Sequence, residues 1–189
     1  MNSINIFQKN WAFTSSDSKK PQIKTGSFGP CYVVTFASSK FAAVAHIDDT
    51  TNVDSIACIF HKFIEHSIPL KDVKVIVLGG WKRHPESFKW GIKIQEKIKE
   101  FGCKEVSTKN MYSKETPTIF QQMGEILMSE VSRYYHLGVL VDSSNGKTFL
   151  LNEISPSLEE EQLKQTQEFA KKYSSDSSLE VPLTQVNNL

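Results

Sequence analysis

Two short apolar runs, Cys31-Tyr-Val-Val-Thr-Phe36 and Phe41-Ala-Ala-Val-Ala-His46, decide the expected fold of this chain. The stretch between them, Ala37-Ser-Ser-Lys40, has a length typical of a β-hairpin connection. In such a hairpin Cys31 begins the first strand and His46 ends the second, so the antiparallel turn brings both residues to one end of the sheet. A cysteine nucleophile requires at least a thiol with an imidazole beside it.

The loop before Cys31 could complete such a site, because it contains Gly26, Gly29 and Pro30. A glycine-containing loop can direct backbone N–H groups at a reacting carbonyl oxygen, and the simplest such donor is the N–H of Cys31 itself. An imidazolium at His46 would also lower the pKa of the thiol from its usual value of about 8.5. It could later give its proton to a leaving group.

The imidazole of His46 needs a third group to fix its orientation and tautomer. Thr25, Asp48 and Asp49 are the candidates near it in the sequence. On the residues alone a plainer interpretation stays open, since a free cysteine at the head of an apolar strand is more often a small core residue. Under that interpretation His46 is a surface residue at a strand end.

Composition and charge exclude several functional classes. The chain has 189 residues, 39% of them hydrophobic and 23% charged, which is ordinary for one soluble globular domain. A net charge of +1, without a dense Lys/Arg run, argues against nucleic-acid binding. No apolar run approaches the ~18 residues that span a membrane.

The cysteines and the N-terminal sequence predict a compartment. The three cysteines, Cys31, Cys58 and Cys103, are odd in number and widely spaced, which is typical of free thiols in the reducing cytoplasm. The N-terminus lacks the pattern of a secretory signal. No His/Cys spacing predicts a metal site, and we interpret Cys58 and Cys103 as structural or incidental.

The remaining pattern mixes helices and strands. Residues 1–24 are expected to form a short strand or an arm on the core, and Thr51 with Asp54 resembles a helix capping box. The other expected elements are a helix at 53–66, a strand at 71–78, a helix from Pro85 to about Phe101, a short strand around Val106, and a hairpin of 133–142 with 147–151. Residues 113–132 are ambiguous between helix and loop.

These elements predict an α/β (α+β) sandwich in which a mixed, mostly antiparallel β-sheet packs with helices. The expected organisation is a single catalytic domain at 1–156, followed at 157–189 by a C-terminal helix and a flexible, Ser-rich tail. The pair Gly79-Gly80, which ends the strand at 71–78, allows the backbone to approach either a ligand or a neighbouring loop.

Three segments together resemble the protein N-terminal asparagine amidohydrolases: Gly29-Pro-Cys31-Tyr-Val-Val-Thr-Phe36, Ala43-Val-Ala-His46-Ile-Asp-Asp-Thr50 and Val75-Ile-Val-Leu-Gly-Gly80. In that family a Cys-led strand, a His-led acidic loop and a Gly-Gly-ended strand occur in this order. The chain is also similar to the bacterial chemotaxis receptor glutamine deamidases, in which a Thr precedes the Cys and a His follows it. Here Thr25 lies six residues before Cys31 and His46 fifteen residues after it.

The likeness covers about residues 22–153 and implies a cysteine-deamidase fold that some deamidating toxins share. It implies that Cys31 is the nucleophile, His46 the acid and base, and Thr25 the orienting group. The implied substrate is a protein or peptide with an Asn or Gln side-chain amide, and the implied products are the acid and ammonia, with no cofactor.

The implied substrate contacts are the acids after His46 and the glycine pair, namely Asp48, Asp49, Gly79 and Gly80. An ammonium at an N-terminal Asn would meet the acids at the rim of the cleft. Two alternatives stay open: deamidation of internal glutamines in a partner protein, and a non-catalytic binding module with the same fold. The sequence does not indicate an oligomeric state.

Overall fold

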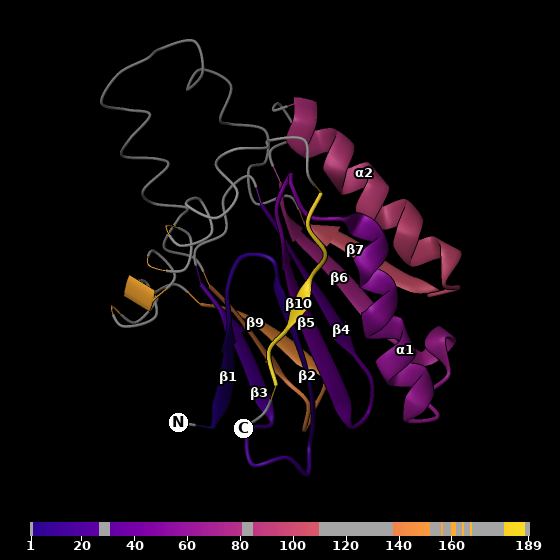
Figure 1. The fold of residues 1–189 in the computed structure, drawn as a ribbon. Coiled ribbons are helices and arrows are strands. Elements are labelled where there is room, and N and C mark those ends of the chain that lie inside the picture. Colours follow the sequence, from indigo (N-terminus) through magenta and orange to yellow (C-terminus); the bar gives the residue numbers. More distant parts are fainter. Residues whose placement is uncertain are drawn as a thin grey trace.

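The computed structural model describes residues 2–26, 31–80, 85–109, 138–151 and 180–187, with isolated positions between 156 and 167. These ranges form an α+β sandwich in which the α-helices α1 and α2 lie on one face of a six-stranded sheet and a four-stranded sheet lies on the other (Figure 1). The pairing is antiparallel except for three parallel pairs, β1–β3, β10–β2 and β6–β7. The predicted fold class is confirmed.

The six-stranded sheet has the strand order β10-β2-β5-β4-β6-β7, and the four-stranded sheet has the order β1-β3-β8-β9. The strands are β1 (Ser3–Ile6), β2 (Asn10–Ser15), β3 (Gln22–Thr25), β4 (Tyr32–Ala37), β5 (Phe41–Ile47), β6 (Lys74–Gly79), β7 (Glu105–Lys109), β8 (Gly138–Asp142), β9 (Lys147–Leu151) and β10 (Thr184–Gln185). The helices are η1 (Val53–Ile56), α1 (Ala57–Glu65), η2 (Leu70–Asp72) and α2 (Pro85–Glu100).

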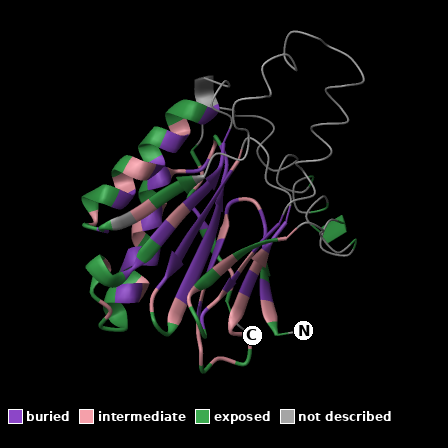
Figure 2. Cartoon of the chain, turned by 180° about the vertical axis from the view of Figure 1, so that it is seen from behind, coloured by how far each residue is buried: buried purple, intermediate pink, exposed green. Residues whose placement is uncertain are grey.

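The hairpin β4–β5 lies at the centre of the molecule because both of its faces are covered. All six residues of β4 are buried, and so are all residues of β5 except Phe41. Buried residues are purple in Figure 2. Alternate side chains of the hairpin therefore enter two cores. Val34 and Phe36 face the helices, whereas Val33 and Val44 face the four-stranded sheet.

The helices predicted at 53–66 and from Pro85 to about Phe101, and the predicted strands of the sheet's centre, agree with the structure. The C-terminal helix expected within 157–189 lies mostly outside the described residues. Gly102, with a φ of 78°, follows the end of α2 as expected for a C-terminal cap. The predicted capping box is wrong in detail, since the Asn52 side chain accepts the hydrogen bond from the Asp54 N–H. The Thr51 hydroxyl instead donates to Asp48.

Two regions differ from the expectation. The first 24 residues contribute most of three strands rather than one arm, and β2 pairs along its length with β5. Part of the expected flexible tail returns to the fold, where β10 pairs with β2 and Leu183 is buried in the core on the helix side. Residues 113–132 and 133–137 lie outside the described residues.

Candidate active site

The β4–β5 register places Cys31 and His46 on one face of the six-stranded sheet. His46 lies directly opposite Val33, and Cys31 leads into β4 two residues before Val33. Because side chains alternate along a strand, Cys31, Val33 and His46 face the four-stranded sheet. Diagonal neighbours of this kind are within reach of each other. The structure therefore brings the predicted pair to the same end of the sheet.

His46 is oriented by a residue of the other sheet. Thr25, the last residue of β3, places its Oγ1 at 2.9 Å from Nδ1 of His46, and both side chains are at most 1% exposed. The tautomer that leaves Nε2 unprotonated has Nδ1–H donating to Thr25 Oγ1. The Thr25 hydrogen can then point to the Gly26 carbonyl oxygen at 3.5 Å.

The resting pair is neutral, which differs from the expected imidazolium and thiolate. Burial raises the pKa of the Cys31 thiol to about 12, and the charges of Asp48 and Asp49 contribute to the rise. Burial also lowers the pKa of His46 to about 4, although the charge of Asp48 opposes this shift. These two shifts favour the neutral thiol and the neutral imidazole over the expected imidazolium and thiolate.

The sequence suggested that Asp48 lies at the rim of a cleft, but the structure places it in the interior. It is 4% exposed, and its Oδ2 lies 2.6 Å from the Lys9 ammonium. Its Oδ1 accepts hydrogen bonds from the Thr50 hydroxyl and backbone N–H and from the Thr51 hydroxyl. Burial would raise the pKa of Asp48, but Lys9, Thr51 and Thr50 together lower it. The carboxylate is thus already fully engaged and cannot offer itself to a substrate ammonium.

Asp49 differs from its neighbour because it is exposed. Its negative charge contributes to the raised pKa of Cys31, so it acts at the thiol through space. Of the two acids expected to bind substrate, only Asp49 is exposed, and substrate contact by it stays a prediction.

Two further residues of the candidate site, Gln8 and Lys9, lie in the turn between β1 and β2 and were not predicted from the sequence. Gln8 Nε2 lies 3.9 Å from Cys31 Sγ and donates to Asp48 Oδ2 at 2.7 Å. Lys9 is 6% exposed and forms the ion pair with Asp48. One feature of the sequence does indicate this turn. Polar residues separate the apolar segments around Ile6 and Trp11, as is typical of a connection between two strands.

The contacts at the end of β6 explain why glycine is needed there. Gly80 donates its N–H to the Cys31 carbonyl oxygen at 3.1 Å. Its φ is 76°, and a Cβ there would overlap the ring of Tyr32. The Tyr32 hydroxyl in turn donates to the Ser87 carbonyl oxygen at 2.8 Å. Gly79 and Gly80 therefore position Cys31, and substrate contact by them stays a prediction.

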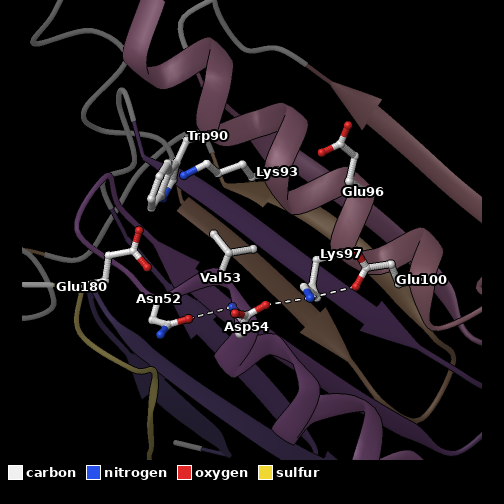
Figure 3. Close-up of a pocket in the computed structure, with 9 residues that line it drawn as sticks. All are labelled: Asn52, Val53, Asp54, Trp90, Lys93, Glu96, Lys97, Glu100 and Glu180. Atoms are coloured by element: carbon white, nitrogen blue, oxygen red, sulfur yellow. Dashed lines mark hydrogen bonds and ion pairs between the residues drawn. The ribbon is translucent and has the colours of Figure 1, made fainter.

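A separate groove of about 260 Å³ lies on the helix side, between η1 and α2 (Figure 3). Its walls are mostly charged, and Lys97 lies between Asp54 and Glu100 in ion-pair contact with both. Lys93 lies over the ring of Trp90. Cys31 and His46 face the other side of the six-stranded sheet, so the groove is not part of their site.

Within the described ranges, no group of three or more His, Cys, Asp or Glu residues is arranged to hold a metal ion. No helix in that part of the chain is long and apolar enough to cross a membrane. Cys31, Cys58 and Cys103 are all free thiols, as predicted. Cys58 is exposed and Cys103 is buried.

The described fold and site together define an α+β sandwich with a cysteine, a histidine and a threonine gathered between its two sheets. Comparison with known protein families finds no match, and no curated protein matches the sequence. Among solved structures, the chain is similar to the Bacillus licheniformis hypothetical protein YfiH, with a TM-score of 0.42 and 9% identity. The match covers 53% of this chain and 50% of that protein, about half the length of each.

Proposed function

We propose that this protein is a cysteine-dependent deamidase that hydrolyses the side-chain amide of an Asn residue in a protein or peptide. The observation that supports it best is the buried contact between Thr25 Oγ1 and His46 Nδ1, on the sheet face that Cys31 shares. A purely structural histidine in the core would also need a hydrogen-bond partner, but it would not need a half-buried thiol on the same sheet face. A nucleophile, a base and a group that orients the base are the arrangement that acyl transfer requires.

In the first half of the reaction the Cys31 thiol gives its proton to Nε2 of His46 while the sulfur bonds to the amide carbon. The C=O π electrons move to the oxygen, which becomes an oxyanion. The C=O bond then forms again and the C–N bond breaks. The nitrogen takes the proton from His46 and leaves as ammonia.

In the second half a water molecule gives a proton to His46 and bonds to the thioester carbon through its oxygen. The C–S bond breaks and the sulfur recovers the proton. The sum is amide plus water giving carboxylic acid plus ammonia, so this chemistry requires no cofactor. Starting from a neutral thiol and a neutral imidazole, it needs no separated charges before substrate arrives.

The charge around the thiol favours an N-terminal Asn as substrate. Asp49 is exposed and its carboxylate raises the pKa of Cys31. A substrate ammonium beside Asp49 would cancel this charge and make loss of the thiol proton easier. Binding of the correct substrate would thereby activate the nucleophile.

Mass spectrometry of three peptides tests the proposal, since conversion of an amide to an acid adds ~1 Da, a consequence of the acyl-transfer chemistry. The peptides carry a free N-terminal Asn, an acetylated N-terminal Asn, or an internal Gln. We expect the free Asn peptide to react roughly 10- to 100-fold faster than its acetylated form, the equivalent of one charged hydrogen bond.

Asp49→Asn should remove most of this preference. The matched control is Asp72→Asn, an exposed acid just before β6, at the opposite end of that strand from Gly79. Equal rates on free and acetylated peptides would contradict N-terminal recognition. Exclusive reaction of the Gln peptide would favour deamidation of internal glutamines, and no mass gain on any peptide would contradict the deamidase proposal itself.

A further inference from the structure

The turn between β1 and β2 presents a side-chain amide to the nucleophile. Gln8 Nε2 is 3.9 Å from Cys31 Sγ and 2.7 Å from Asp48 Oδ2. A primary amide nitrogen carries two hydrogens. One N–H therefore serves the Asp48 carboxylate while the other is directed at the sulfur.

The turn is held in place by more contacts than a surface connection needs. Lys9 has a φ of 63°, a left-handed conformation that is uncommon for residues other than glycine. Its N–H donates to the His46 carbonyl oxygen at 2.8 Å, and its carbonyl oxygen accepts from Thr184 N–H at 2.9 Å. Its ammonium contacts the Asp48 carboxylate that also holds Gln8. Unfavourable backbone geometry that the surroundings maintain in this way is typical of functional sites.

We propose that Gln8 is a further catalytic residue, whose side-chain N–H stabilises negative charge on the Cys31 sulfur and on the oxygen of the substrate adduct. Asp48 and Lys9 are positioning residues that fix the Gln8 amide. This inference rests on the proposed amidohydrolase function, because the oxyanion exists only if Cys31 attacks a carbonyl group.

The position of the Gln8 amide suits both the thiolate of Cys31 and the oxyanion of the substrate adduct. The backbone N–H of Cys31 lowers the pKa of its own thiol, so Gln8 supplies a second donor at the same atom. In the tetrahedral adduct the oxyanion is bonded to the carbon that carries the sulfur. Donors gathered around the sulfur are therefore close to the oxyanion, for which a separation of about 2.7–3.1 Å is needed.

The test uses Gln8→Met, which keeps an unbranched side chain of similar length and removes both N–H groups. Its matched control is Gln22→Met, since Gln22 is also half-buried and donates from Nε2 to a carboxylate, that of Asp142, at 3.0 Å. Gln22 begins β3, whereas Thr25 ends it, so the control is remote from His46. All proteins carry Cys58→Ser to remove the exposed thiol.

The first measurement is the rate at which iodoacetamide alkylates Cys31 at pH 9, read by peptide mass spectrometry. A hydrogen bond to the thiolate lowers the pKa of the thiol, so Gln8→Met should react about tenfold more slowly and Gln22→Met at the parent rate. The second measurement is kcat and KM for ammonia release. Loss of one oxyanion donor should lower kcat roughly 10²- to 10³-fold and leave KM nearly unchanged.

Losses in both measurements, with an unchanged melting temperature, support the role of Gln8. Parent rates in either measurement for Gln8→Met overturn it. If the parent protein releases no ammonia from any peptide, the deamidase proposal has failed, and the alkylation rates alone still decide whether Gln8 supports the Cys31 thiolate. If Gln8→Met does not fold, Gln8→Leu, which also lacks the donors, replaces it in both measurements.

Discussion

At the scale of single residues, the proposed orienting role of Thr25 requires a hydroxyl group at position 25. In the proposed reaction His46 accepts the Cys31 proton and becomes an imidazolium, whose Nδ1–H would donate to Thr25 Oγ1, 2.9 Å away. Thr25→Val keeps the shape and removes the acceptor, so kcat/KM for ammonia release should fall roughly 10- to 100-fold. Thr25→Ser keeps the hydroxyl and should stay within a few-fold of the parent. Equal activity of the two variants would contradict the orienting role.

Burial of His46 also makes the stability of the fold depend on pH. The pKa of His46 is about 4 in the folded protein and 6.5 when unperturbed, so the unfolded chain takes up a proton first as pH falls. The free energy of unfolding should therefore be unaffected by His46 above about pH 6.5 and decrease between there and pH 4, by up to about 3 kcal/mol.

Urea unfolding of the parent and His46→Gln from pH 7 to pH 4 measures this contribution. His46→Gln should lose less stability over this range than the parent, whereas His61→Gln, at an exposed helix position, should follow the parent. A parent and a His46→Gln variant with the same pH dependence would show that His46 is not buried in its neutral form.

At the scale of elements, the end of β6 sets the position of the strand that follows Cys31. Gly80 contacts the Tyr32 ring and donates to the Cys31 carbonyl oxygen, and Gly91 of α2 lies against the same ring. A Cβ at Gly80 would meet both a left-handed backbone and the aromatic ring. The end of β6 and α2 are thereby fixed around Tyr32, next to Cys31 in the sequence.

Gly80→Ala should lower the free energy of unfolding by about 2–5 kcal/mol, the sum of backbone strain and overpacking. Gly102→Ala is the matched control, because its φ is 78° and nothing lies within 4 Å of an added Cβ. Gly102→Ala should lower the free energy of unfolding only by the backbone strain, about 1–2 kcal/mol. Similar losses for the two variants in urea unfolding would mean that Tyr32 does not close on Gly80.

At the scale of the whole molecule, the last described residues join the helix side of the core to the β1–β2 turn. Leu183 is buried with α1 and η1 residues, and its N–H donates to the Ser55 hydroxyl at 3.0 Å. Thr184 N–H reaches the Lys9 carbonyl oxygen beside the site. Removal of the segment should therefore affect both the core and the turn that holds Gln8.

Leu183→Ala should lower the free energy of unfolding by about 2–4 kcal/mol, because it deletes buried methyl groups and leaves a cavity. Gln185→Ala, at an exposed position of β10, should change it by less than about 0.5 kcal/mol. Chemical denaturation of both variants distinguishes them, and an unchanged Leu183→Ala would contradict docking of this segment.

The central hairpin was predictable because its residues are buried on both faces and so form continuous apolar runs. β10 was not, since both of its side chains are exposed and only its backbone pairs with β2. β2 was missed because its partner β5 lies far along the chain, and local patterns do not report such pairing.

The site was predictable to the extent that it depends on one hairpin and one nearby strand. Cys31 and His46 follow from the β4–β5 turn. Thr25 was one of three candidate partners of His46, and only the family resemblance singled it out. Gln8 could not be found in this way, because its contact with Cys31 depends on how the β1–β2 turn folds over the sheet. The neutral state of the thiol also depends on burial, which sequence spacing does not show.

The most direct test of the central claim is ammonia release from a peptide with a free N-terminal Asn, measured for the parent protein and for Cys31→Ala. The parent should release one ammonia for each peptide that gains ~1 Da, and Cys31→Ala should release none, because without the sulfur no thioester can form. Cys58→Ser, which removes the exposed thiol, should remain fully active. Ammonia release by Cys31→Ala at the parent rate would contradict the account.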